Sequence, residues 1–282
     1  MKKSPVPSNV NSNVKKKKSS KKKRRRMRRI RKLLVFLLLA AGLVVFARSS
    51  FFIVEKIDVT GNNKYSEKEL ILKTGLVPGE NVFIMLGEKP KNLLKFRFSD
   101  LEQQVLNSMP YVKSVSIRPA LPTAIKIKVE ERTPFAVLEA NGKNLLVDRE
   151  GFVLEVLDNK SSQLKNYFKI IGTSVDSFNL GQAVKLKDGL SFSDISGFCD
   201  VVIKNDKNEK LKLYKKITVI DLVDFPYFSV LFDNRIMVKF SDVENADYEL
   251  SVFRHLFVNN FNEKQKGTLD FTKGSNPYFK PD

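Results

Sequence analysis

Residues 121–138 read LPTAIKIKVEERTPFAVL and contain the clearest strand pattern of the chain. Apolar and charged side chains alternate between residues 124 and 131. The apolar positions are Ile125, Ile127 and Val129, and the charged positions are Lys126, Lys128 and Glu130. This period of two predicts a β-strand with one buried face and one solvated face. We interpret the two lysines as the solvated face rather than as a ligand-binding stripe.

Upstream of this strand, the pattern predicts one compact unit. Residues 53–62 and 111–119 each predict a further strand. Two Ser-x-x-Glu sequences, Ser66–Glu69 and Ser99–Glu102, are capping boxes that predict helix starts between these strands. The predicted order is β-α-α-β-β over about eighty residues. Asn81–Leu86 lies between the helices and is expected to be a loop and a second contact surface.

Downstream, short strands alternate with turns. Asn141-Gly142 is a strong signal for a β-hairpin. Residues 190–205 and 246–261 predict helices, and in the second of them apolar residues recur at helical spacing. Residues 267–272 (GTLDFT) predict a last strand, which we expect at the edge of the sheet.

The basic residues are concentrated at the N-terminus. The chain of 282 residues has a formal charge of +19, and residues 1–32 hold 16 basic and no acidic residues. The other 250 residues hold 34 basic and 31 acidic residues, so no folded domain has the basic composition of a nucleic-acid binder. We expect the basic tail to bind anionic lipid of the inner leaflet. Nucleic acid, held through counterion release, and a cytoplasmic protein are the alternative partners.

A membrane segment follows the basic tail directly. Leu33–Ala47 has no polar side chain, and extension to Phe52 gives about 20 residues, which is enough to cross a bilayer. The preceding cations predict a cytoplasmic N-terminus and extracytoplasmic C-terminal domains. A signal peptide cleaved after Ala47 is the alternative, because Val45-Phe46-Ala47 has the required spacing of small residues.

Catalytic residue types are scarce. The chain has one cysteine, Cys199, and one histidine, His255, with no supporting motif, so we expect no enzyme activity. No cofactor is expected, and no metal site either, because ligands other than carboxylates are lacking. The charges at Asp148-Arg149-Glu150 flank a turn and are interpreted as solvated.

The whole pattern resembles the FtsQ/DivIB family of bacterial cell-division proteins. Residues 121–138 are similar to the family's Pro-x-x-(apolar)-x-(apolar)-x-(apolar)-x-Glu-Arg-x-Pro-x-Ala signature, and the β-α-α-β-β unit resembles a POTRA domain. Leu146–Gly151 and the closing LDFTKGSNPYFKP also resemble family motifs. Three features depart from the pattern: tryptophan is absent, the last helix begins among acidic residues, and Phe271 and Thr272 stand where an arginine is usual.

The resemblance implies a fold class and a function. The fold class is α+β, with a single transmembrane helix, a POTRA-type domain and a mixed, mostly antiparallel β-domain. The expected parts are a disordered cytoplasmic tail (1–32), a transmembrane helix (33–52), a POTRA domain (53–132), a β-domain with a C-terminal helix and an edge strand (133–272) and a flexible tail (273–282). The implied function is that of a septal scaffold of the divisome that controls peptidoglycan synthesis. A membrane-tethered cell-wall enzyme and a POTRA-bearing export or chaperone component are the alternatives.

The implied partners are bitopic division proteins of the FtsB/DivIC and FtsL type. In the family, a partner segment adds a strand to the last strand of the β-domain. A short strand near the C-terminus permits this, because unpaired edge groups are a template for strand addition. The residues expected to contact the partner are Leu269, Asp270, Phe271, Thr272, Tyr278 and Phe279. Burial of Leu269 against the sheet is the alternative for that residue.

Overall fold

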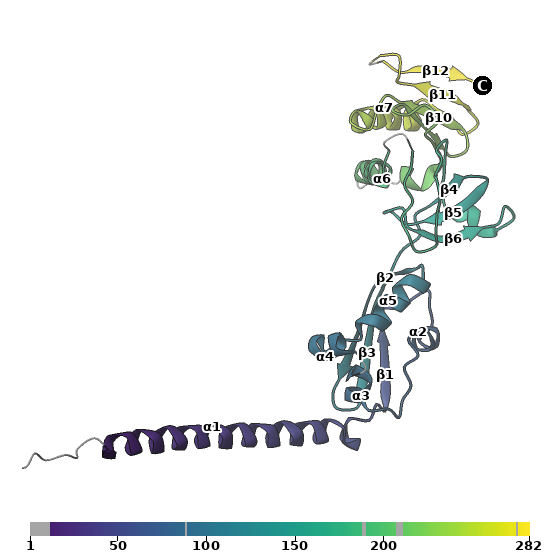
Figure 1. Cartoon of the computed structure of the whole chain (residues 1–282). Coiled ribbons are helices and arrows are strands. Elements are labelled where there is room, and N and C mark those ends of the chain that lie inside the picture. The colour runs from purple at the N-terminus through teal and green to yellow at the C-terminus, as the bar shows by residue number, and fades with distance from the viewer. Residues whose placement is uncertain (1–11, 88, 188–189, 207–210, 275) are drawn as a thin grey trace, which may run out of the picture. The chain divides into compact units, whose positions relative to one another are not determined.

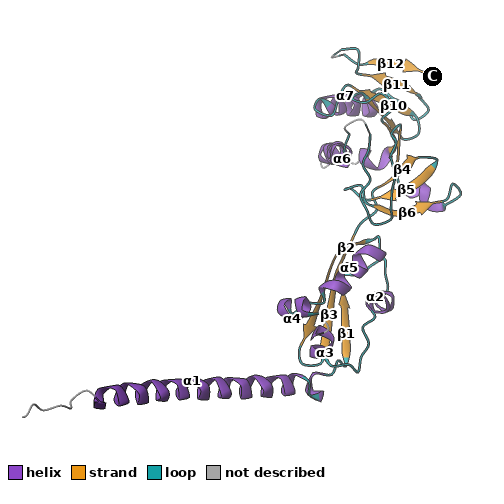
Figure 2. Cartoon of the chain, in the orientation of Figure 1, coloured by secondary structure: helices purple, strands orange, loops and turns teal. Residues whose placement is uncertain are grey.

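The computed structural model describes residues 12–87, 89–187, 190–206, 211–274 and 276–282, with side chains from residue 24 onward (Figures 1 and 2). The helices are α1 (Ser12–Ala47), α2 (Glu67–Thr74), α3 (Val82–Gly87), α4 (Pro90–Lys95), α5 (Ser99–Ser108), α6 (Phe192–Asp206) and α7 (Ala246–Asn259). The strands are β1 (Lys56–Thr60), β2 (Val112–Ala120), β3 (Ala124–Glu131), β4 (Ala136–Ala140), β5 (Lys143–Val147), β6 (Val153–Leu157), β7 (Lys169–Ile171), β8 (Ile217–Asp221), β9 (Phe228–Phe232), β10 (Ile236–Phe240), β11 (Gly267–Asp270) and β12 (Tyr278–Pro281). Three short 3-10 helices are η1 (Ser50–Phe52), η2 (Ser162–Asn166) and η3 (Leu213–Lys216).

The chain divides into two compact units. The first contains residues 1–58, 77–97 and 118–126. The second contains residues 59–76, 98–117 and 127–282.

Helix α1 combines the basic and the apolar segments. Within the described residues, the stretch Arg24–Ala47 is long and apolar enough to cross a membrane. The expected disorder is wrong for residues 12–32, which are helical, because Lys and Arg are good helix formers and extend the apolar helix toward the N-terminus. Residues 1–11 lie outside the described residues. The helix also ends at Ala47 rather than at Phe52, and η1 follows it.

The three-stranded sheet has the order β1-β3-β2. Its strand β3 has the predicted pattern, with Ile125, Ile127 and Val129 buried. The capping box at Ser66 is formed at the start of α2, and Gly75 ends this helix in the left-handed conformation. The second predicted box is wrong: Phe98 is the N-cap of α5, and Glu102 instead accepts a hydrogen bond from Ile117 N at 2.7 Å.

Helix α3 occupies the segment Asn81–Leu86, where the sequence predicts a loop. The short helix α4 follows and packs against α3. Six-residue helices are too short to carry much periodic signal. Helices of this length are also unstable in isolation and depend on tertiary contacts.

The β-domain is a nine-stranded mixed sheet of order β12-β11-β10-β9-β8-β7-β4-β5-β6. The pairs β10/β11, β4/β7 and β7/β8 are parallel, and the other five are antiparallel. The hairpin predicted at Asn141-Gly142 joins β4 to β5, with both residues at positive φ. Both predicted helices are present, as α6 and α7, and they lie beside the sheet in Figure 2. Their Phe198 and Phe253 belong to the main core.

Two sequence motifs meet in the second unit. Arg132 of the Glu-Arg-x-Pro motif binds Asp148 at 2.6 Å and Glu150 at 3.1 Å. The Arg132 and Asp148 side chains are only 8% and 7% exposed, and the guanidinium also stacks over Phe152. Neighbouring Glu131 accepts backbone hydrogen bonds from residues 63–65. The expectation of solvated charges is therefore wrong for Asp148, because folding buries this carboxylate against an arginine 16 residues away.

Candidate protein-interaction site

The last strand of the sheet is β12, which lies outside β11. Its residues pair antiparallel with β11, from Gly267 opposite Pro281 to Asp270 opposite Tyr278. The expectations of an edge strand at residues 267–272 and of a flexible tail at 273–282 are therefore wrong, because residues 278–281 form the outer strand (Figure 1). The opposite edge, β6, is partly covered: Val153 N donates to Gln182 O at 3.0 Å, and Gly181 N donates to Val153 O at 2.8 Å.

The register determines which backbone groups of β12 point away from the sheet. Asp282 N donates to Lys266 O, while Gly267 N and Phe271 N donate to β10 or its flank. Because inward and outward groups alternate along an antiparallel strand, residues 278, 280 and 282 face β11, and residues 279 and 281 face outward. Pro277 and Pro281 have no N–H. Among residues 277–281, Phe279 thus presents the one outward N–H donor.

The side chains of β12 differ in exposure. Tyr278 is 60% exposed. Phe279 is partly buried and packs on Phe261 with ring centroids 4.7 Å apart. Strand β12 is therefore held by its pairing with β11 and by the contact of Phe279 with Phe261, whereas the side chain of Tyr278 is exposed to solvent.

The two apolar residues predicted on β11 and just after it are in the core. Leu269 is 1% exposed, and Phe271 is 3% exposed and stacks parallel to Phe240 at 6.3 Å. This corrects the expectation that both side chains are available to a partner. Leu269 and Phe271 alternate with Thr268, Asp270 and Thr272, so both side chains lie on the face of the sheet that the core covers.

Asp270 and Thr272 form the turn that leaves β11. Thr272 donates to Asp270 Oδ1 through both its N–H (2.9 Å) and its hydroxyl (2.6 Å). Burial acts to raise the pKa of Asp270, but these hydrogen bonds and the charges of Lys239 and Lys273 outweigh it and lower the pKa below its ordinary value. The carboxylate is therefore occupied in shaping the turn.

A groove runs beside this turn. Its lining is Pro226, Tyr227, Ser241, Asp242, Asn245, Tyr248, Glu249, Phe271, Thr272 and Gly274. Tyr227 and Tyr248 are exposed aromatic residues, a type that is enriched at protein interfaces. Glu249 is buried and accepts hydrogen bonds from Ser241, and burial raises its pKa. No sequence motif indicates this groove, since its residues come from separate segments.

Of the two residues considered for catalysis, the cysteine is buried and the histidine is exposed. Cys199 is fully buried, and burial raises its pKa to about 12, so the thiol remains protonated. His255 Nδ1 lies 3.2 Å from the side-chain amide of Asn259 on the same helix. No group of three or more possible metal ligands occurs among the described residues.

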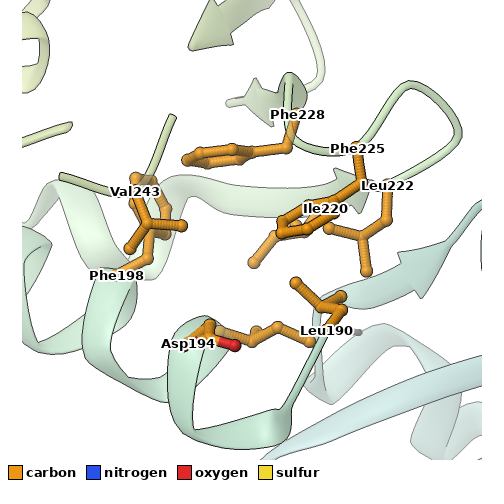
Figure 3. Close-up of a pocket in the computed structure, with 9 residues that line it drawn as sticks. Leu190, Asp194, Phe198, Ile220, Leu222, Phe225, Phe228 and Val243 are labelled. Atoms are coloured by element: carbon orange, nitrogen blue, oxygen red, sulfur yellow. The ribbon is translucent and has the colours of Figure 1, made fainter. Parts of the chain in front are cut away.

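A small pocket between α6 and the sheet is apolar. Figure 3 shows Phe198, Phe228, Ile220 and Leu222 around it, with Asp194 as a polar residue at its wall. Asp194 accepts hydrogen bonds from the backbone and hydroxyl of Ser191. Its carboxylate therefore caps the start of α6, and the pocket offers hydrophobic packing rather than acid–base chemistry.

Comparison with known proteins identifies the N-terminal folded part. Residues 52–132 match the family model described as "POTRA domain, FtsQ-type". These residues are an FtsQ-type POTRA domain. The α+β fold class, with an N-terminal apolar helix, this POTRA domain and a mixed sheet-rich domain, is confirmed.

Similarity to curated proteins extends through most of the chain. A cell division protein DivIB of Clostridium acetobutylicum is 25% identical over 229 residues, which cover 81% of this chain and 83% of the relative. DivIB of Clostridium tetani is 23% identical over 71% of this chain and 68% of its own length. FtsQ of Agrobacterium fabrum is 27% identical over 49% of this chain and 39% of the relative. The resemblance to the FtsQ/DivIB family is thereby confirmed, and it supports a role in cell division.

Proposed function

We propose that this chain is a non-enzymatic scaffold of the divisome. It would bind bitopic division proteins of the FtsB/DivIC and FtsL type outside the membrane and help to control septal peptidoglycan synthesis. The observation that carries this proposal is the outer edge of β12, where Phe279 N–H and the carbonyls of residues 279 and 281 face away from the sheet. Tyr278 and Phe279 remain the predicted contact residues.

A single added strand fits this edge. The added strand could accept one hydrogen bond from Phe279 N–H and donate to the outward carbonyls. Because Pro277 and Pro281 have no N–H, this edge resists pairing with unrelated strands. Prolines on edge strands are a known protection against uncontrolled strand addition. The groove with Tyr227 and Tyr248 could then receive side chains of the partner.

The topology is part of the same proposal. The 16 cations of residues 1–32 favour a cytoplasmic N-terminus, which would put the POTRA domain and the β-domain on the outer side at the septum. The basic tail would bind anionic lipid of the inner leaflet, with nucleic acid as the disfavoured partner.

Photocrosslinking in membranes tests the proposed function. A photoreactive phenylalanine analogue replaces Tyr278 in the full chain, and a matched control carries it at Leu72, which is 82% exposed on α2. We expect position 278, and not position 72, to capture a bitopic division protein. Capture of diverse unfolded exported polypeptides would favour the export or chaperone alternative. Peptidoglycan turnover by the purified full chain would favour the cell-wall enzyme.

A further inference from the structure

Arg24–Ala47 as a whole is long enough to cross a membrane, but its uninterrupted apolar part is shorter than the bilayer core. Leu33–Ala47 contains fifteen residues, and the helix ends at Ala47. At ~1.5 Å per residue these residues extend ~22 Å, whereas the hydrocarbon core of a bilayer is ~30 Å thick. A short span is accommodated by thinning of the bilayer or by drawing the flanking residues toward it. The residues that follow Ala47 are therefore held close to the lipid.

A buried asparagine ties α3 to the end of this helix. Asn81 donates through its side-chain amide to Ala47 O at 3.0 Å and to Ser49 O at 2.8 Å. Its side-chain oxygen accepts from Phe83 N at 2.9 Å and Ile84 N at 3.2 Å, at the start of α3. The same side chain thus satisfies the last carbonyl of α1, the carbonyl of Ser49 just beyond it and the first amides of α3, so the two helix ends are adjacent.

Aromatic rings continue the connection. Phe46 of α1 contacts Phe52 of η1 at 5.2 Å, and Phe52 contacts Phe83 of α3 at 4.9 Å. Phe83 in turn lies 6.2 Å from Phe96, which follows α4. Aromatic residues concentrate at membrane interfaces. Since α3 is only ~9 Å long, this connection keeps α3 within about the thickness of a headgroup layer from the end of α1.

Helix α3 buries Val82 and Leu86, but α3 and α4 also expose other apolar residues. Leu94 is 87% exposed, and Ile84 and Leu93 are about half exposed. The exposed lysines Lys91 and Lys95 lie on the same short helix α4. Apolar side chains flanked by lysines are typical of surfaces that lie in the plane of a membrane interface.

We propose that α3 and α4 form a membrane-interface surface, defined by Ile84, Leu93 and Leu94 with Lys91 and Lys95, which inserts into the outer leaflet beside α1. The occupant is phospholipid, because the surface is joined to the membrane span by Asn81 and the aromatic contacts and because its lysines match anionic headgroups. The proposal rests on α1 crossing the membrane, and it is independent of what binds β12.

Site-specific fluorescence in vesicles tests the proposal. The full chain with Leu94→Cys is labelled with an NBD fluorophore and reconstituted into vesicles of phosphatidylcholine and phosphatidylglycerol, with or without doxyl-labelled lipid. Cys199 is fully buried, so native labelling selects the new thiol. A matched control carries the label at Val223→Cys, a comparably apolar and 68% exposed residue of the β-domain. We expect doxyl lipid to quench position 94 by about twofold or more, as for a probe inserted ~5–10 Å into the interface, and to quench position 223 little.

Two further measurements define the outcome. Lys91→Glu with Lys95→Glu, made in the Leu94→Cys chain, should reduce the quenching in vesicles containing phosphatidylglycerol more than in pure phosphatidylcholine. Equal quenching at positions 94 and 223 would overturn the proposal. So would unquenched fluorescence at position 94 together with a disulfide between two unlabelled copies of the Leu94→Cys chain, because a second copy of the chain would then cover the surface.

Discussion

A Phe279→Pro substitution removes the outward N–H of β12 and leaves its pairing with β11 in place. The N–H of residue 279 takes no part in the β11/β12 ladder, since residues 278, 280 and 282 face β11. Proline is compatible with an edge strand when its missing N–H faces solvent. The substitution therefore tests the added strand with little change to the fold.

The expected effect follows from one hydrogen bond. Without this N–H, a carbonyl of the added strand becomes buried and unsatisfied, which costs about 1–3 kcal/mol. The partner's Kd should rise by about 5- to 150-fold. Phe279→Ala is the matched control, because it loses the same aromatic packing on Phe261 but retains the N–H. Binding of the extracytoplasmic part of the captured partner to the full chain is measured by titration calorimetry.

Two neighbouring positions make the comparison directional. Lys280→Pro removes an inward N–H and should reduce both the pairing of β12 and the binding. Pro281→Ala adds an outward N–H and should leave binding unchanged or tighten it by up to about tenfold. If Phe279→Pro and Phe279→Ala bind the partner equally, the Phe279 N–H is unused and strand addition at this edge is wrong.

Four further predictions concern stability. Arg132→Ala should lower the free energy of unfolding by about 3–5 kcal/mol in denaturant titrations, because it leaves Asp148 buried and unpaired. The control Lys187→Ala breaks an exposed ion pair with Asp176 and should change the free energy of unfolding little. Equal effects of the two substitutions would contradict the burial argument. Phe271→Lys should unfold the β-domain rather than weaken binding selectively, and a folded Phe271→Lys chain, judged by near-UV circular dichroism, would place Phe271 outside the core. Ile127→Ala should lower the free energy of unfolding of the POTRA domain by about 2–5 kcal/mol. Burial raises the pKa of Glu249, so the folded state holds this proton more tightly than the unfolded state. Stability therefore falls as pH rises from the ordinary Glu pKa of about 4.3 through the raised value. Glu249→Gln should remove this slope from Tm measured against pH, and an unchanged slope would assign the slope to another group.

Local patterns predicted the elements whose stability is local. The alternation at residues 124–131 predicted β3, the Ser66–Glu69 box predicted the start of α2, and Asn141-Gly142 predicted the β4/β5 hairpin. In each, the deciding interaction lies within a few residues along the chain. The concentration of cations before an apolar segment likewise predicted a membrane helix from composition alone.

The misses share one physical cause, which is that distant residues override a local preference. Glu102 leaves the predicted capping box for Ile117 N, 15 residues away, and α3 begins where Asn81 also binds Ala47 O. Strand β12 has only four residues and is flanked by a proline, so its local sequence is typical of a tail; it is a strand because β11 supplies its hydrogen bonds.

The amino-acid sequence by itself determined an apolar N-terminal helix that is long enough to cross a membrane, and the POTRA unit that follows it, because periodicity and charge are properties of neighbouring residues. The tertiary structure decided which surfaces are available. It buried Phe271 against Phe240, paired Arg132 with Asp148 and made β12 the outer strand. Exposure depends on what packs against a side chain from elsewhere in the chain, and a linear pattern does not contain that information.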